Sequence, residues 1–253
     1  MTVVRLCLLA AALLLQAAGL QAQTLRVLTT GAFKQVVTAI LPAHRAATGL
    51  EIEVVSDTAG ALARRIEAGE PFDVVVLTPA ALAALAERGK VDGAGIRPVA
   101  RVAIGVAART GAPVPPLETV EQFVAAVLAA RRVAYIDPAS GGSSGVYLDA
   151  LFARLGIADA VRAKAVLVPG GYAAERVASG EADLAIHQVS EILPVAGVTL
   201  AGTLPPQIQN WTTYATAVSA TGPHRGAAAA FAAAFRTREG AATIRAKGME
   251  PLD

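Results

Sequence analysis

Short apolar segments rich in β-branched residues alternate with longer amphipathic segments along most of the chain. The apolar segments predict strands over residues 25–28, 51–55, 73–77, 101–107, 133–136, 165–168 and 184–187. The amphipathic segments predict helices over residues 33–48, 59–68, 79–88, 120–130, 144–155, 173–179 and 225–246. This alternation is typical of an α/β protein with mostly parallel sheets.

The first 22 residues have the pattern of a cleaved secretory signal. Arg5 precedes an apolar run over residues 6–15, and small residues follow up to Ala22, after which we expect cleavage. The run is shorter than the ~20 residues of a membrane-spanning helix, and no later segment is a better candidate. We therefore expect a periplasmic protein whose mature chain does not insert into a membrane.

Composition narrows the chemistry. The only cysteine, Cys7, lies in the leader, so neither a disulfide nor a thiolate metal site is expected. The net charge is +2, from 22 basic and 20 acidic residues, and only 4% of residues are aromatic, which argues against nucleic-acid binding. The other two histidines, His44 and His224, lie far from the motif that contains His187, so no metal site is expected.

Two strand-to-helix turns could present backbone N–H groups to an anion. The first contains Thr30 and Gly31, and the second contains Thr58, Ala59 and Gly60. Helix N-termini carry unpaired N–H groups and a partial positive charge, so both turns are candidate ligand-binding sites. The alternative is that they only begin helices.

Residues 137–147 form the most informative turn. The segment contains three glycines and three serines, and Ser143, Ser144 and Gly145 lead into a helix. Such a turn can form an anion-binding nest, although a flexible surface loop is the alternative. It lacks the Lys-Ser/Thr ending of a P-loop, and no Gly-x-Ser-x-Gly elbow is present, which disfavours a hydrolase.

Later turns add polar groups and the candidate proton carriers. Gly170, Gly171 and Tyr172 follow one strand, and Gln188 and Ser190 follow another, so all five are further candidate ligand-binding residues. Proton transfer would need a general acid or base in the same crevice. The candidates are Tyr147, Tyr172, His187 and Glu191.

Three segments carry a resemblance to a known family. They are GALARRIEAGEPFDV at 60–74, the Asp137-Pro138 turn leading to Gly145-Val146-Tyr147, and SGEAD at 179–183. The chain resembles the periplasmic molybdate-binding proteins and related type II binding proteins of ABC importers. The resemblance implies a two-lobed α/β fold with a ligand cleft between the lobes and two crossover strands. We expect lobe 1 to span 23–99 plus 201–253, and lobe 2 to span 100–200.

The binding positions depart from the molybdate pattern. Gly31 stands where a serine is common, Thr58-Ala59 replaces paired serines, Ser143-Ser144-Gly145 replaces Pro-Ala-Gly, and Gln188 stands where a tyrosine is usual. The leading hypothesis is therefore a monomeric receptor that delivers a small anion, an organic carboxylate, to an ABC importer permease. The alternative, implied by a related branch, is a cofactor-free trans-aconitate isomerase. A tricarboxylate also needs compensating positive charge, for which Lys34 and Arg176 are the nearest candidates, although solvated helix residues are an equally good explanation of both.

Overall fold

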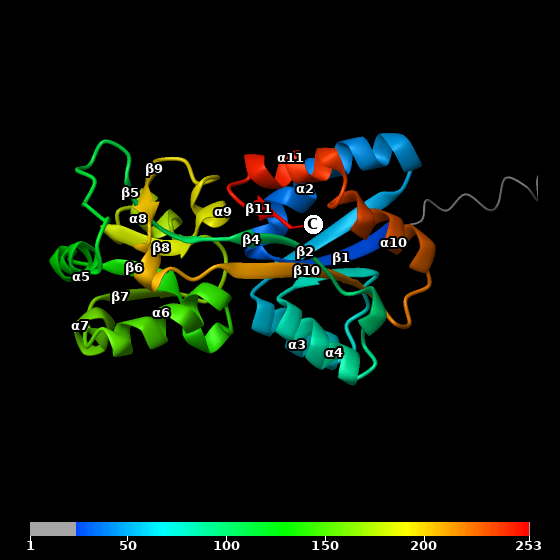
Figure 1. The fold of residues 1–253 in the computed structure, drawn as a ribbon, viewed down its shortest axis with the longest axis horizontal. Helices are drawn as coiled ribbons and strands as arrows, with labels where there is room; N and C mark the ends of the chain where they lie inside the picture. The colour runs from blue at the N-terminus through cyan, green and yellow to red at the C-terminus, as the bar shows by residue number, and fades with distance from the viewer. Residues whose placement is uncertain (1–23, 253) are drawn as a thin grey trace, which may run out of the picture.

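The computed structural model describes residues 24–252, so the predicted signal peptide lies outside the described residues. These residues form two lobes, each with its own mixed sheet and flanking helices (Figure 1). No helix within this range is long and apolar enough to cross a membrane. The same range contains no group of three or more His, Cys, Asp or Glu residues that could hold a metal ion.

The first lobe contains a six-stranded sheet in the order β11-β4-β10-β3-β1-β2. The three strands β1, β2 and β3 are parallel, and β10 runs antiparallel to β3 and β4. The elements of this lobe are β1 (Thr24–Thr30), α2 (Gly31–Thr48), β2 (Glu51–Asp57), α3 (Ala59–Glu67), β3 (Val74–Leu77), α4 (Pro79–Glu87), η2 (Gly93–Gly95), β4 (Arg97–Val102), β10 (Thr212–Val218), α10 (Arg225–Ala234), α11 (Arg238–Ala246) and β11 (Glu250–Pro251).

The second lobe contains a five-stranded sheet in the order β7-β6-β8-β5-β9. Strand β6 is parallel to β7 and β8, and β5 is antiparallel to β8 and β9. The elements of this lobe are β5 (Ile104–Arg109), α5 (Val120–Ala129), β6 (Val133–Ile136), η3 (Pro138–Ser140), α6 (Ser143–Arg154), α7 (Ala158–Arg162), β7 (Ala165–Val168), α8 (Glu175–Ala178), β8 (Leu184–Gln188), α9 (Val189–Ile192), β9 (Val198–Thr203) and η4 (Pro206–Ile208).

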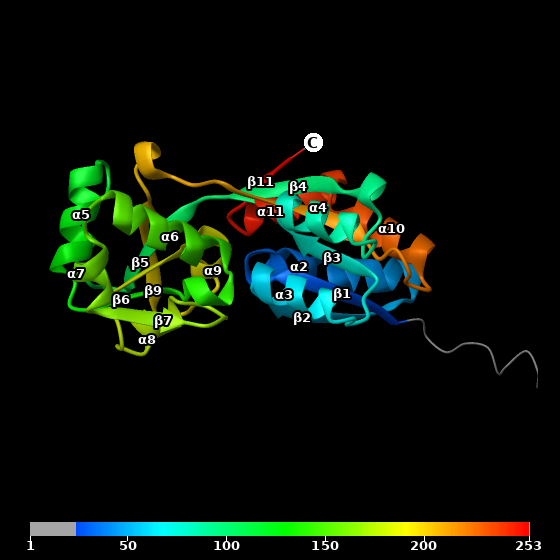
Figure 2. The same cartoon turned by 90° about the horizontal axis from the view of Figure 1, so that it is seen from below.

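The chain crosses between the sheets twice, from β4 to β5 and from β9 to β10 (Figure 1). The Gln209 amide ties the two crossings together, because its Oε1 accepts from the Ile104 N–H at 2.9 Å and its Nε2 donates to the Ile104 carbonyl at 3.0 Å. The lobes also touch beside the crossings. Val189 of α9 packs into the core of the first lobe, and α9 lies next to α2 (Figure 2).

Aromatic contacts fix the packing of helices in each core. In the first lobe the Phe33 and Phe231 rings both meet Phe235 edge-on, at centroid distances of 5.1 and 5.3 Å. In the second lobe Tyr135 meets Phe152 edge-on at 5.5 Å. Such edge-to-face pairs add to the stabilisation that burial already gives. They hold α2 against α10 in the first lobe and α6 against β6 in the second.

Two predicted elements are wrong in extent. The helix predicted over 225–246 is two helices, because the chain turns after Ala234 and Thr237 caps α11 by accepting from the Gly240 N–H at 3.0 Å. The strand predicted over 101–107 is two strands in different sheets, broken at Ala103. Strands β9, β10 and β11 were not predicted, because the glycine and prolines around β9 and β10 indicated only a loop.

Candidate functional site

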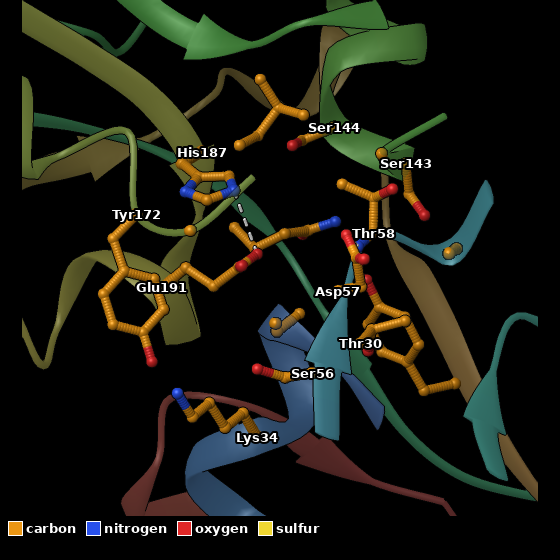
Figure 3. A pocket seen from close by; sticks show the side chains of 18 of the residues that line it. Thr30, Lys34, Ser56, Asp57, Thr58, Ser143, Ser144, Tyr172, His187 and Glu191 are labelled. Carbon is orange, nitrogen blue, oxygen red and sulfur yellow. Dashed lines mark hydrogen bonds and ion pairs between the residues drawn. The ribbon is translucent and has the colours of Figure 1, made fainter. Parts of the chain in front are cut away.

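A cavity of about 190 Å³ lies between the lobes at the carboxyl ends of several strands (Figure 3). The first lobe contributes its β1–α2 and β2–α3 turns, together with β10. The second lobe contributes the β6–α6, β7–α8 and β8–α9 turns. Ligands bind in this position in open α/β sheets, because the loops that follow the strands are free to vary.

Three helices of nine residues or more begin at this cavity: α2, α3 and α6. The Thr30 side chain does not cap α2, and Gly142 has no side chain with which to cap α6. The first N–H groups of both helices therefore lack a side-chain acceptor, and the dipoles point positive ends toward one space. The arrangement favours a bound anion.

Several buried polar atoms of the lining have no hydrogen-bond partner among the described residues. They are Thr30 Oγ1, His187 Nδ1 and Gln188 Oε1. Leaving a buried polar atom unpaired costs about 1–3 kcal/mol, so such atoms require an explanation. Their position in one cavity fits groups that pair with a ligand.

His187 and Glu191 form a buried acid–base pair in the same cavity. His187 Nε2 lies 3.1 Å from Glu191 Oε2, and the two residues are 1% and 6% exposed (Figure 3). His187 is the penultimate residue of β8, and Glu191 lies four residues later in α9, so a short stretch of backbone positions both side chains. Buried titratable pairs in clefts are candidate functional groups, since burial of such groups is costly for folding.

The Gly31 position explains one departure from the molybdate pattern. A Cβ atom at Gly31 would lie 2.4 Å from Glu191 Oε1, closer than any van der Waals contact allows. The space that a serine side chain would occupy is therefore filled by the Glu191 carboxylate, and glycine at 31 and glutamate at 191 form a matched pair across the lobes.

We expect Gly31→Ala to weaken ligand binding at least tenfold with little loss of stability. The new methyl group would push the Glu191 carboxylate into the cavity, where it would repel an anion. Isothermal titration of the same ligand into the variant and into the wild-type protein measures the difference in affinity. Equal affinities would show that Glu191 does not limit the ligand space.

Tyrosines from both lobes line the cavity as neutral hydrogen-bonding groups. Burial, reinforced by the negative charge of Glu191, raises the pKa of Tyr214 well above its usual range. Burial also raises the pKa of Tyr172, whose hydroxyl accepts a 2.8 Å hydrogen bond from Gln35 Nε2 of the other lobe. Both hydroxyls therefore stay protonated at neutral pH.

The lobes meet at the rim of the cavity. Thr58 Oγ1 donates to the Ser140 carbonyl at 2.7 Å, and the Gly60 N–H donates to the Gly141 carbonyl at 3.1 Å. A Cβ atom at Gly60 would lie 2.8 Å from the Gly141 Cα, so glycine is required for this approach. These bonds hold the cavity closed on one side.

The structure brings most of the predicted site residues together. Those that line the cavity are Thr30, Gly31, Thr58, Ala59, Ser143, Ser144, Gly171, Tyr172, His187, Gln188 and Glu191. Of the two basic residues considered, Lys34 lines the cavity, whereas Arg176 pairs with Glu181 at 3.1 Å.

Five predicted residues do not line the cavity: Gly60, Gly145, Gly170, Ser190 and Tyr147. Gly60 mediates the contact between lobes, and Gly145 packs against the Ile136 backbone. The Tyr147 hydroxyl donates to the Ile208 carbonyl at 2.7 Å, which gives it a structural role. Ser190 is buried, and its Oγ has no partner within residues 24–252.

Sequence reasoning missed four polar lining residues: Ser56, Asp57, Glu175 and Tyr214. Ser56 and Asp57 end β2, and the polar ending of that strand was a usable signal. Asp57 is neutralised by Arg65, whose Nη1 lies 3.2 Å from Asp57 Oδ2. Tyr214 lies in the unpredicted strand β10, so the sequence offered no signal for it.

The fold and cavity define a two-lobed α/β protein with a cleft between its lobes, and comparison with known proteins places it in a family. A model of the bacterial extracellular solute-binding proteins matches residues 25–250, and the chain belongs to this family. The chain is 33% identical over 235 residues to an aconitate isomerase from Pseudomonas sp, covering 90% of this chain and 88% of that protein.

Solved structures confirm the predicted two-lobed α/β fold. The periplasmic molybdate-binding protein of Azotobacter vinelandii has a TM-score of 0.73 at 19% identity, over 90% of this chain and 100% of that one. The sulfate-binding protein SubI of Mycobacterium tuberculosis H37Rv has a TM-score of 0.73 at 21% identity, over 91% of this chain and 88% of that one. At these identities the likeness shows the fold alone.

Proposed function

We propose that this protein captures a small organic carboxylate between its lobes, outside the cytoplasm, for delivery to an ABC importer. The observation that carries the proposal is the convergence of three helix N-termini on a cavity that also contains the Thr30 hydroxyl, a possible donor that is unpaired among the described residues. Anions bind at such N-termini because N–H groups and dipoles point at them. Membership of the solute-binding family supports the same role.

The lining favours an organic acid over a metal oxyanion. The cavity of about 190 Å³ has room for about six water molecules at ~30 Å³ each. The lining contains hydroxyls from both lobes, the Gln188 amide and the Lys34 ammonium. These separate donors suit a ligand with several acceptors at a distance from one another. Glu191 fills the place of the serine that the molybdate pattern offers at residue 31, which removes one oxyanion donor.

A second candidate function is isomerisation of aconitate on the same scaffold. Two observations favour it: the buried His187–Glu191 pair in the cavity, and the aconitate isomerase among the relatives. A base would remove a proton from the methylene carbon of trans-aconitate, and the proton would return at the other end of the allylic system. The reaction needs no cofactor, because proton and electron pair both stay within the substrate and the site.

A thermal-shift screen with product analysis tests both functions. The purified protein is incubated with molybdate, tungstate, sulfate, citrate, cis-aconitate and trans-aconitate, and each organic acid is then examined by NMR. A ligand that binds only the folded state raises the melting temperature. A shift with an organic acid supports the receptor, and conversion of trans- to cis-aconitate supports the isomerase. A shift with metal oxyanions alone would contradict both.

Ser144→Ala and Gln188→Ala are expected to weaken organic-acid binding about five- to twentyfold each. Loss of one hydrogen bond to a charged group removes about 1.5 kcal/mol. Gln188 Nε2 also donates to Thr212 Oγ1 at 2.9 Å, so its variant should lose some stability as well. Isothermal titration measures the affinity and thermal melting the stability. Unchanged affinity in both variants would remove these residues from the site.

A further inference from the structure

The lining of the cavity is richer in acidic than in basic groups. Three carboxylates, from Asp57, Glu175 and Glu191, face Lys34 and His187. Arg65 neutralises Asp57 at 3.2 Å. An organic anion that enters this space therefore meets negative charge as well as helix N-termini.

Of the three lining carboxylates, Glu191 lies nearest to the position where the anion is expected to bind. Its Oε1 lies against the first turn of α2, because a Cβ atom at Gly31 would be 2.4 Å away. Its Oε2 lies 3.1 Å from His187 Nε2. The side chain thus stands at one of the N-termini that would hold the ligand, and it is only 6% exposed as a residue.

We propose that the His187–Glu191 pair takes up one proton when an organic anion binds. This inference rests on the proposed function of the cavity. Two negative charges close together in a water-poor site favour protonation of one of them, as in pairs of carboxylates. The pair can accept that proton at His187 as an imidazolium or at Glu191 as a carboxylic acid. Either form removes one negative charge from beside the ligand.

The groups around Glu191 leave the pair as the proton acceptor. From the packed elements these groups are His187 of β8, Lys34 of α2, Asp57 of β2, Tyr214 of β10, Tyr172 of the turn before α8, and Glu175 of α8. Both tyrosines already carry their protons, since burial raises the pKa of each. Glu175 forms no salt bridge among the described residues and is exposed, so water can stabilise its charge, and it serves as the control.

Proton uptake makes affinity depend on pH in a defined direction. Binding strengthens as pH falls, because the bound state holds one more proton than the free protein and ligand. Full uptake of one proton changes the dissociation constant about tenfold per pH unit. The last carboxyl of a tricarboxylate ionises at about pH 6, above an isolated carboxyl, because the charges already present disfavour its ionisation. The slope is therefore read between pH 7.5 and 8.5, where the ligands are fully ionised and do not contribute to it.

Isothermal titration tests the proposal. Citrate, cis-aconitate and trans-aconitate are each titrated into the purified protein between pH 7.5 and 8.5, in buffers of different ionisation enthalpy. We expect close to one proton taken up per ligand in at least part of this range. The double variant His187→Gln/Glu191→Gln should bind with an affinity that no longer varies with pH, whereas Glu175→Gln should keep the wild-type slope.

The outcomes separate this inference from the proposed function. Binding of any of the three acids without proton uptake by the wild-type protein overturns the proton coupling and leaves the receptor intact. A pH slope that survives in the double variant His187→Gln/Glu191→Gln also overturns it. Failure of all three acids to bind at any pH overturns the proposed function and this inference together. Proton uptake by the wild-type protein tests the proton coupling even if a variant is unstable.

Discussion

Replacing Gly145 with alanine is expected to lower the melting temperature of the protein by about 6–12 °C. A Cβ atom at this position would lie 2.2 Å from the Ile136 carbonyl oxygen and 2.9 Å from its carbon, so backbone must move. Overpacking of this kind costs about 3 kcal/mol. In domains of this size each kcal/mol lost from the free energy of unfolding lowers the melting temperature by about 2–4 °C. Thermal unfolding followed by circular dichroism measures the shift.

Gly226→Ala is the matched control for this prediction. Gly226 lies in α10, is exposed, and has no heavy atom within 4 Å of the Cβ position. Alanine there should raise helix stability by about 0.5 kcal/mol, because it restricts the unfolded chain. Equal melting temperatures for Gly145→Ala and the wild-type protein would contradict the close packing of α6 against β6. That packing sets where Ser143 and Ser144 present their N–H groups.

If the protein isomerises aconitate, Glu191→Gln is expected to reduce turnover by about 10²–10⁴-fold. This range is the usual contribution of a positioned general acid or base. Glutamine has nearly the same shape and can still accept a hydrogen bond from His187 Nε2, so the fold should be preserved. NMR of trans-aconitate over time measures the conversion, and thermal melting checks the fold.

Glu175→Gln is the control for this loss of turnover. Glu175 lines the same cavity but forms no salt bridge with His187, so its amide variant should keep turnover within a few-fold of the wild type. Wild-type turnover in Glu191→Gln would exclude Glu191 as the proton carrier. A wild-type protein that binds trans-aconitate and leaves it unconverted would contradict the isomerase and leave the receptor as the function.

Much of the fold could be predicted because local pattern and tertiary structure agree in the βα units. Thr30-Gly31, Thr58-Ala59 and Ser143-Ser144 each follow a short apolar strand and begin an amphipathic helix. Such punctuation is readable in a single sequence. The carboxyl ends of parallel strands share one edge of a sheet, so the first two turns could be expected to meet. The third turn belongs to the other sheet, and only the two-lobed fold that the family resemblance implies places it across the cleft from them.

The rest depended on contacts between segments distant in sequence. Strand β10 was missed because Gly202, Pro205 and Pro206 precede it, and its Tyr214 was lost with it. The fit between Gly31 and Glu191 crosses the two lobes, so neither residue reveals the other in the sequence. The Gly60–Gly141 contact likewise exists only once both lobes are built.

The central claim is that a small organic carboxylate binds between the lobes at the three helix N-termini. A crystal structure of the protein with the organic acid that gives the largest thermal shift tests it most directly. We expect carboxylate oxygens within hydrogen-bonding distance of the first N–H groups of α2 and α6, and of the Thr30 hydroxyl or the Gln188 amide. Ligand density elsewhere, with this cavity filled only by water, would contradict the claim.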